Sequence, residues 1–314
     1  MKIGMINSNL KGQSNPIMQL NQALEDSSKL AHAYLFQGPP GLGKNALAFE
    51  FAHALLGSDM KHNPDLMILE KQGSTIRIAE IRNLQEWLTY KPYRSERRVA
   101  VIPEAHLMSN EAANAFLKTL EEPAGPTVLI MTADKETLPA TVVSRCRVIR
   151  FMPLSWEEVA EILVERGIDK ERAKTLSVIS EGSPGRALAL AEIDLDGLLQ
   201  KTAGLLKDLL KGDAFTGFEM AEALDKDSAG REAVLAILDI YCRDAMFYAN
   251  GFNAGVLLVS DDLAAELAGM GTGSLREVMR LVAGARQNLN GNANPLLTMV
   301  SMFLKIGEVA KEVV

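Results

Sequence analysis

The sequence predicts an α/β domain built on a parallel β-sheet, followed by segments that are helical throughout. Three observations support this prediction. Short apolar runs alternate with helical patterns in the first half of the chain, a glycine-rich loop at residues 38–45 joins one such run to a helical pattern, and only helical patterns follow Pro153. Strands that alternate with helices favour parallel pairing, with the helices covering the faces of the sheet.

The elements of the first half follow from their apolar spacing. Five runs of strand length are expected to form the sheet: Ala33–Phe36, Asp65–Leu69, Val99–Ile102, Thr127–Thr132 and Arg147–Phe151. Helical spacing predicts helices between them at Lys44–Leu56, Ile78–Leu88 and Asn110–Leu120. The run Val99–Ile102 is apolar throughout, which is typical of a parallel strand that is buried on both faces.

The second half is predicted to contain helices only. Ser155 and Glu158 have the spacing of a capping box, which indicates a helix that starts there and ends near Gly167. Further helices are expected at residues 170–179 and 184–191, and the remaining segment carries amphipathic helices with loops around Gly212, Gly251 and Gly271. These patterns predict three domains: an α/β P-loop domain at 1–153, a small helical domain at 154–194 and a larger helical domain at 195–314.

Composition excludes several classes of protein. The 314 residues are 47% hydrophobic, which is enough for two or three domains with buried cores. No apolar run has the length of a membrane span and the first residues lack an apolar signal core, so we expect a cytoplasmic protein with no membrane partner. The net charge of −7 argues against nonspecific coating of nucleic acid.

Residues 38–45, Gly-Pro-Pro-Gly-Leu-Gly-Lys-Asn, match the phosphate-binding loop pattern G-x-x-x-x-G-K-[ST] as far as Lys44. Gly38, Gly41 and Gly43 allow successive backbone N–H groups to turn toward phosphate oxygens, and Lys44 would reach the outer phosphates. Asn45 stands where a hydroxyl group would help to hold the magnesium ion. The loop therefore keeps the cradle for phosphate and lacks one metal ligand.

A second metal ligand is also missing. An ATPase of this kind needs an acid after a neighbouring strand to position magnesium. Directly after Val99–Ile102 the chain has Pro103, which carries no carboxylate. Glu104 follows, either as a group that polarises water or as a solvated loop carboxylate. With Asn45 and Pro103 both unable to supply the usual oxygen, we expect no intrinsic ATPase activity and no required cofactor. Weak ATP or ADP binding through backbone donors stays open.

Three more polar residues are candidates for contacts to phosphate groups. Thr132 ends the fourth strand, where its side chain would face the loop. Arg145 precedes the fifth strand and can reach a neighbouring subunit, where an arginine stabilises charge on a transferring phosphoryl group. Arg186 lies in the first turn of the helix at 184–191 and can fold over bound phosphates. The ordinary interpretations are a strand-end threonine, a surface arginine and an exposed arginine at a helix start.

Together these residues resemble the clamp-loader branch of the AAA+ family, and more narrowly the delta-prime subunits of bacterial DNA polymerase III. The matching stretches are residues 32–36 leading into 38–44, then 63–65, 114–123, 138–146, 182–188 and 292–297. The similarity is continuous up to residues 182–188 and thinner after them. The Ser144-Arg145-Cys146 segment and the Leu120-Glu121-Glu122-Pro123 segment form a specific pair.

The resemblance implies an AAA+ P-loop domain, a helical lid domain and an all-α collar domain that joins subunits. It implies a hetero-pentameric ring with gamma/tau motor subunits and delta, which places the sliding clamp on primed DNA. Arg145 would be the arginine supplied in trans to an adjacent motor subunit, and Thr132 and Arg186 match the two sensor positions. The zinc module of the motor subunits is absent, since the short segment between Gly57 and Pro64 has no cysteine, and no zinc is expected.

The sequence therefore predicts a non-hydrolysing clamp-loader subunit of delta-prime type, with degenerate Walker motifs, that acts as a stator and donates Arg145. One alternative is a catalytically active, gamma/tau-like ATPase in which Glu104 and a shifted ligand restore the metal site. Another is an AAA+ protein of DNA repair or helicase loading, which the collar-like C-terminal segment disfavours.

Overall fold

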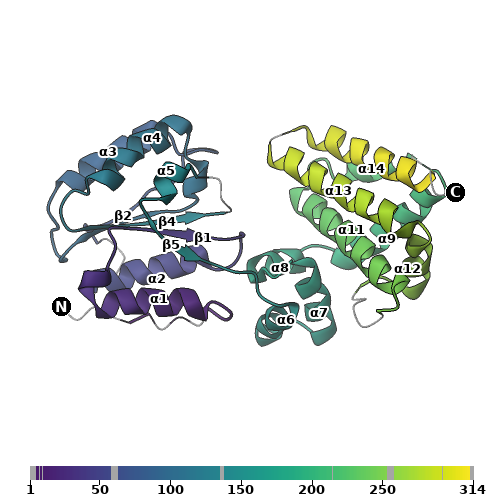
Figure 1. Ribbon diagram of the computed structural model, residues 1–314, viewed down its shortest axis with the longest axis horizontal. Coiled ribbons are helices and arrows are strands. Elements are labelled where there is room, and N and C mark those ends of the chain that lie inside the picture. The colour runs from purple at the N-terminus through teal and green to yellow at the C-terminus, as the bar shows by residue number, and fades with distance from the viewer. Residues whose placement is uncertain are drawn as a thin grey trace. The chain divides into compact units, whose positions relative to one another are not determined.

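The computed structural model describes residues 5, 6, 8, 10–57, 63–134, 138–213, 215–252, 258–291 and 293–311. The chain divides between Leu154 and Ser155 into two compact units. The first unit is α/β and the second is helical (Figure 1). The predicted boundary between a lid and a collar, at residues 194–195, lies within the second unit and stays a prediction. Asn292, which begins the last matching stretch, is outside the described residues.

Five parallel strands form the sheet of the first unit, which confirms the predicted α/β class. The order across the sheet is β2-β3-β4-β1-β5. The strands are β1 (Ala33–Gln37), β2 (Leu66–Ile68), β3 (Arg98–Ile102), β4 (Thr127–Ala133) and β5 (Arg147–Arg150). In this order β1 lies between β4 and β5, so that Tyr34 pairs with Ile130 on one side and with Arg147 on the other.

Helices cover both faces of this sheet (Figure 1). On one face lie α1 (Ser14–Glu25) and α2 (Lys44–Leu56), and on the other lie α3 (Ile78–Thr89), α4 (Asn110–Glu121) and α5 (Ala140–Val143). Two 3₁₀ turns, η1 (Ser27–Lys29) and η2 (Ala105–Leu107), complete the unit. The predicted α2, α3 and α4 are confirmed. The sequence pattern does not predict α1, which has no side-chain N-cap, or α5, which is a single turn.

Successive side chains of β1 pack on opposite faces of the sheet. On the α2 face the ring of Tyr34 meets Phe51 edge-on, with the ring centroids 4.9 Å apart, and Phe36 also packs near Phe51. Ala33 and Leu35 belong to the hydrophobic core shared with α3 and α4. Because both faces are covered, β1 is apolar at nearly every position, as the sequence of a central parallel strand should be. This packing fixes the strand whose end leads into the glycine-rich loop.

The second unit is entirely helical over its described residues. Its helices are α6 (Trp156–Glu165), α7 (Lys170–Ile179), α8 (Pro184–Ala191), α9 (Leu195–Leu210), α10 (Phe215–Ala223), α11 (Ser228–Ala249), α12 (Asp261–Ala268), α13 (Gly271–Asn290) and α14 (Pro295–Lys311). The predicted capping box at α6 is confirmed, since Ser155 accepts a hydrogen bond from the backbone of Glu158, and the Glu158 carboxylate accepts one from the backbone of Ser155.

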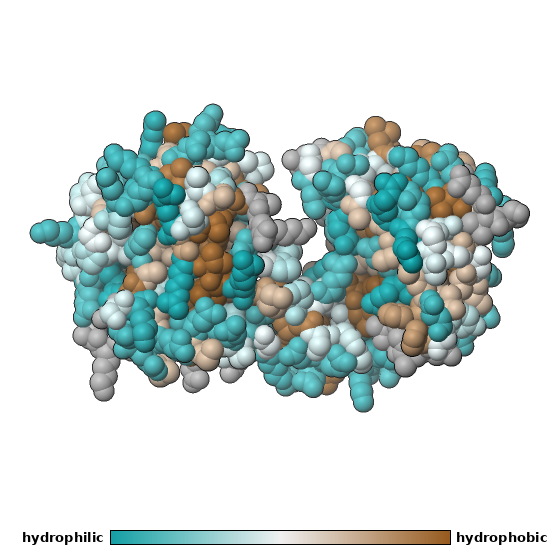
Figure 2. Space-filling view, in the orientation of Figure 1, coloured by the Kyte–Doolittle hydropathy of each residue, from teal (hydrophilic) through white to brown (hydrophobic). Residues whose placement is uncertain are grey.

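The long helix α11 organises the second unit. Its residues 233–238 are all buried, which marks a helix surrounded by others on every side. Helices α9, α12 and α13 pack against it. Polar residues cover most of the surface seen in Figure 2. Among the described residues, no helix combines the length and the apolar character needed to cross a membrane.

Candidate functional site

An open pocket of about 410 Å³ lies at the carboxyl ends of the adjacent strands β3, β4 and β1, where parallel α/β sheets bind their ligands. Its lining comprises the following residues: Pro40, Gly41, Gly43, Lys44, Asn45, Ala46, Glu104, Thr132 and Asp134. The fold therefore brings the predicted Thr132 to the glycine-rich loop. Gly38, also predicted, is not a lining residue, but its carbonyl oxygen accepts a hydrogen bond from the Lys44 side chain.

The loop has the backbone shape that its glycines predict. Gly41 and Gly43 have φ angles of 77° and 85°, in the left-handed region that glycine adopts without strain. A Cβ atom on Gly38 would lie 2.4 Å from the carbonyl oxygen of Phe151, so only glycine fits there. Gly43 is the N-cap of α2, and the first turn of that helix faces the pocket. A loop of this shape that leads into a helix N-terminus suits an anion.

Lys44 is fully engaged within the first unit. Its Nζ atom lies 2.7 Å from the carbonyl oxygen of Gly38 and 2.6 Å from that of Pro39. It also forms an ion pair with the carboxylate of Asp134 at 2.7 Å. The lysine side chain is only 6% exposed. The ammonium group predicted to bind phosphate thus has protein oxygens as its partners.

Asn45 and Thr132 hydrogen-bond to each other across the pocket. The hydroxyl group of Thr132 donates to Oδ1 of Asn45 at 2.7 Å and accepts from the backbone N–H of Glu104 at 3.0 Å. These contacts join the first turn of α2 to the ends of β4 and β3. The side chain at the metal-ligand position of the loop therefore serves to connect the elements around the pocket.

Two carboxylates line the pocket. Glu104 forms an ion pair with Lys71 at 2.8 Å and is 41% exposed, so its contacts suit a partly solvated loop residue as well as a pocket residue. Asp134 follows β4 and is not among the predicted site residues. The sequence did hold a signal for it, because a polar residue just after a parallel strand lies at the ligand-binding edge. The backbone N–H of Asp134 donates to Nδ1 of His106 at 3.2 Å.

The pocket lacks the two magnesium ligands that the loop pattern leads one to expect. Asn45 stands in place of the hydroxyl group and Pro103 in place of the acid, and the oxygens of Asn45 and Thr132 are engaged with each other. Among the residues that the structure describes, no group of three His, Cys, Asp or Glu side chains is placed to hold a metal ion. Burial raises the pKa of Cys146 to about 12, which keeps its thiol protonated and unsuited to metal binding.

Arg145 lies near the amino ends of the parallel strands, whereas this pocket lies at their carboxyl ends. It precedes β5, whose first residue, Arg147, pairs with Tyr34 near the start of β1, whereas the glycine-rich loop follows the end of β1. The arginine side chain is 36% exposed, and its guanidinium group donates to the carbonyl oxygen of Thr141 at 2.8 Å and forms an ion pair with Glu121. Its position at the surface is compatible with contact to another subunit and not with contact to its own loop.

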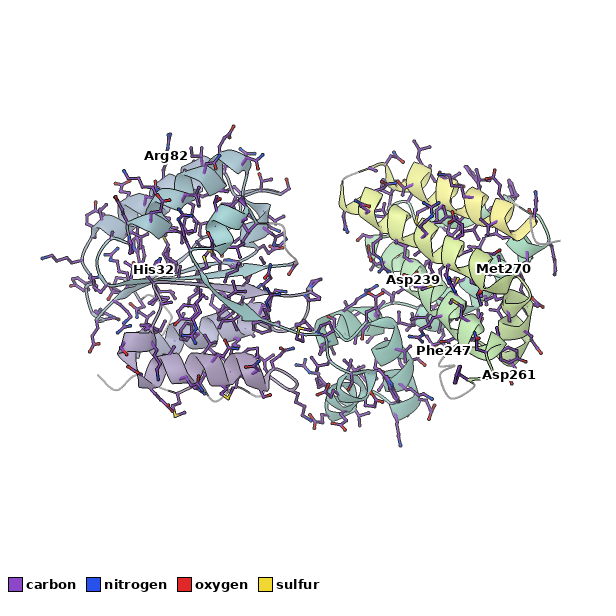
Figure 3. The ribbon with its side chains drawn as sticks, in the orientation of Figure 1. His32, Arg82, Asp239, Phe247, Asp261 and Met270 are labelled. Atoms are coloured by element: carbon purple, nitrogen blue, oxygen red, sulfur yellow. The ribbon has the colours of Figure 1, made fainter. Side chains whose placement is uncertain are left out.

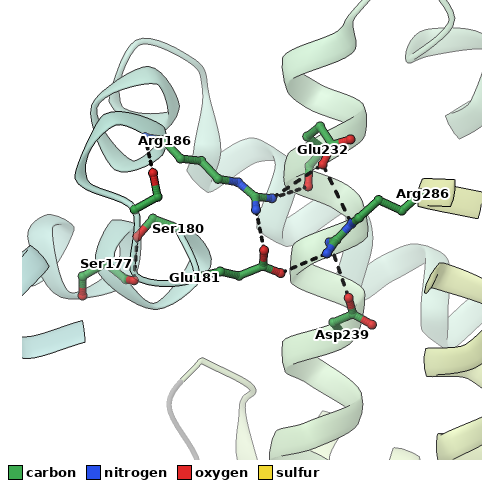
Figure 4. A network of polar contacts seen from close by, with 8 residues as sticks. Ser177, Ser180, Glu181, Arg186, Glu232, Asp239 and Arg286 are labelled. Atoms are coloured by element: carbon green, nitrogen blue, oxygen red, sulfur yellow. Dashed lines mark hydrogen bonds and ion pairs between the residues drawn. The ribbon is translucent and has the colours of Figure 1, made fainter. Parts of the chain in front are cut away.

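Arg186 belongs to a charge network in the second unit (Figure 4). Its guanidinium group donates to the carboxylate of Glu181 at 2.6 Å and to the carbonyl oxygen of Glu232 at 3.1 Å. Arg286 also contacts Glu181, at 3.2 Å, and lies 3.4 Å from Asp239 (Figure 4). Asp239 belongs to α11 (Figure 3). Burial raises the pKa of Asp239 to about 6, although Arg286 acts to lower it. The network joins α8 to α11 and α13, and whether Arg186 contacts phosphate stays a prediction.

Comparisons with known proteins find similarity to subunits of bacterial DNA polymerase III. Residues 12–155 match the family described as "DNA polymerase III, delta subunit". The DNA polymerase III subunit delta' of Bacillus subtilis is 29% identical over 51% of this chain and 54% of its own length. That of Pseudomonas aeruginosa is 30% identical over 58% of this chain and 61% of its own length. Subunit tau/gamma of Haemophilus influenzae is 32% identical over 58% of this chain and 30% of its own length. The chain thus spans about half the length of the delta' relatives.

Proposed function

We propose that this chain, whose residues 12–155 match the family described as "DNA polymerase III, delta subunit", is a non-hydrolysing clamp-loader subunit of delta-prime type. It acts as a stator and donates Arg145 to the ATP site of a neighbouring motor subunit. The observation that carries the proposal is the combination of a pocket without the usual magnesium ligands and an arginine exposed at the opposite end of the strands of the same sheet.

The pocket supports the non-hydrolysing half of the proposal. Hydrolysis of ATP needs a divalent ion that bridges the outer phosphates and a group that orients the attacking water. The positions that would hold the ion carry Asn45 and Pro103, and Glu104 is paired with Lys71. Nucleotide can bind here only through the backbone cradle, so weak ATP or ADP binding is the most that the residues support, with no zinc and no required cofactor.

The position of Arg145 supports the arginine-donor half. A guanidinium group that completes another subunit's site must be at the surface and free to move by a few ångströms. The ion pair of Arg145 with Glu121 is partly exposed, and such pairs contribute only about 0–1 kcal/mol. Exchange of Glu121 for a phosphate of higher charge is therefore favourable once a neighbour presents one.

The proposed partners follow from the proposed function. They are gamma/tau motor subunits and delta in a hetero-pentameric ring, with the sliding clamp and primed DNA reached through the complex, in the cytoplasm. We expect native mass spectrometry of this chain mixed with candidate motor and clamp-opening subunits to show a five-membered assembly with one copy of this chain. A mixture in which this chain stays unassembled would contradict the proposed place in the ring.

The competing function is an active, gamma/tau-like ATPase, and the similarity to a tau/gamma subunit favours it. We expect the purified chain to show no ATP turnover above background, and Lys44→Ala to leave that background unchanged, because the pocket lacks its metal ligands. The measurement is phosphate release with magnesium present. Turnover that disappears in Lys44→Ala would instead establish the active ATPase.

A further inference from the structure

The contacts of Lys44 account for all the donors of its side chain. A lysine ammonium group has three N–H bonds and no acceptor. Here the carbonyl oxygens of Gly38 and Pro39 and the carboxylate of Asp134 lie 2.6–2.7 Å from the nitrogen, which matches one oxygen to each N–H bond. With the side chain 6% exposed, no donor is directed to solvent. A phosphate oxygen can bind Lys44 only by replacing one of these three oxygens.

Asp134 is the partner that a phosphate would replace. The two carbonyl oxygens belong to the loop itself and follow its fold, whereas Asp134 comes from the end of β4 and carries the only charge among the three partners. Its side chain is 31% exposed and lines the same pocket that a phosphate would enter. An anionic oxygen held at hydrogen-bond distance from Lys44 is chemically what a nucleotide would supply.

The charges of the pocket also oppose the binding of a nucleotide phosphate. Its lining has one cation, Lys44, and two anions, Glu104 and Asp134. Glu104 is neutralised by Lys71, which stands outside the lining, and Asp134 is neutralised by Lys44 itself. A nucleotide that displaces Asp134 from Lys44 therefore places its own phosphates beside a carboxylate that has lost its ion pair with the lysine. Like charges at such short range in a partly desolvated pocket repel strongly.

We propose that the Asp134 carboxylate pairs with Lys44 in the place of a phosphate group. This ion pair, the Asp134 latch, excludes nucleotide from the degenerate loop. The proposal rests on the proposed function, in which the loop is the remnant of a nucleotide site, and it adds the residue that keeps the site closed. The loss of metal ligands stops hydrolysis, whereas the Asp134 latch acts on binding. Asp134→Asn removes the charge and keeps the shape, so that Lys44 has a neutral acceptor oxygen in place of a carboxylate.

The test compares binding of a fluorescent N-methylanthraniloyl-ADP probe in EDTA across matched variants. We expect Asp134→Asn to bind the probe about 10- to 100-fold more tightly than the natural sequence, the range expected for loss of one charge-assisted hydrogen bond. Glu104→Gln makes the same change of charge in the same pocket without touching Lys44, and its effect should be smaller than about threefold. Adding Lys44→Ala to Asp134→Asn should abolish the gain. Thermal unfolding checks that every variant is folded.

Each other outcome would contradict the proposal that the ion pair of Asp134 with Lys44 excludes nucleotide. Equal gains for Asp134→Asn and Glu104→Gln would show that only the total charge of the pocket matters. Tight, Lys44-dependent binding by the natural sequence, unchanged in Asp134→Asn, would show that the ion pair offers no obstacle. Absence of binding in all variants would show that the loop no longer takes nucleotide even when released. None of these results affects the role of Arg145, which is measured by the ATPase activity of the assembled complex.

Discussion

Replacing Arg145 by alanine is expected to lower ATP turnover at the neighbouring subunit's site by about 10³-fold or more, the effect measured when an arginine supplied in trans is lost. The guanidinium group would stabilise charge on the transferring phosphoryl group, and alanine supplies nothing in its place. The measurement is phosphate release by the reconstituted complex, with Arg145→Ala in this chain and unaltered partners. Assembly is followed by native mass spectrometry, so that lost activity can be separated from lost association.

Two control variants make this result specific. Arg147→Ala removes the same charge two residues further along, from a side chain that donates to the carbonyl oxygen of Lys29, and it should leave turnover within about twofold. Arg145→Lys keeps the charge but lacks the planar fork that binds two oxygens, so it should restore only part of the rate. The ion pair with Glu121 is partly exposed, and its loss should change the unfolding free energy by less than about 1 kcal/mol. Unchanged turnover in the assembled Arg145→Ala complex would remove the proposed role.

Replacing Asp65 by alanine is expected to lower the free energy of unfolding by about 3 kcal/mol. Asp65 is completely buried, and its carboxylate accepts backbone hydrogen bonds from Tyr93, Arg94 and Ser95 at 2.6–2.7 Å. These three contacts hold the loop between α3 and β3 against the start of β2. Alanine leaves three backbone N–H groups without their anion. Chemical denaturation monitored by circular dichroism measures the change.

The pH dependence gives this prediction a second readout. Burial acts to raise the pKa of Asp65, but the three backbone hydrogen bonds outweigh it and lower the pKa below its ordinary value near 3.8. A carboxyl group with a lowered pKa in the folded state stabilises the fold above its unfolded pKa, and the stabilisation disappears as the pH falls through the folded pKa. The difference in unfolding free energy between the natural sequence and Asp65→Ala should therefore be constant at pH 5–7 and shrink below about pH 4.

An exposed acid of the same loop supplies the comparison. Glu96 is mostly exposed and lies 3.8 Å from Arg97, so Glu96→Ala should change the unfolding free energy by less than about 1 kcal/mol. Asp65→Asn keeps one acceptor oxygen and should fall between Asp65→Ala and the natural sequence. A pH profile of Asp65→Ala that runs parallel to that of the natural sequence below pH 4 would show that the carboxylate charge does not stabilise the loop.

The sequence was sufficient to predict a helix where residues next to the helix fix its two ends. The predicted bounds of α2 match the structure because Gly43 and Gly57, both with left-handed φ angles, flank the helix. Helix α1 lacks such signals. The residue before it, Gln13, makes no cap and instead donates to the carbonyl oxygen of Met152, which is distant in the sequence. Because that contact exists only in the folded unit, the pattern of residues 14–25 did not reveal the helix.

The sequence by itself determined the chemistry of the loop: three glycines, a lysine and an asparagine in the place of a metal-binding hydroxyl, between a strand and a helix. It also identified Thr132, because the ends of parallel strands meet at one edge. Which charged group pairs with Lys44 was decided by the tertiary structure alone. The strand order places β4 beside β1, and this brings Asp134 within 2.7 Å of the lysine. A residue's own sequence neighbourhood fixes its backbone conformation, whereas its charge partner depends on which strands lie side by side.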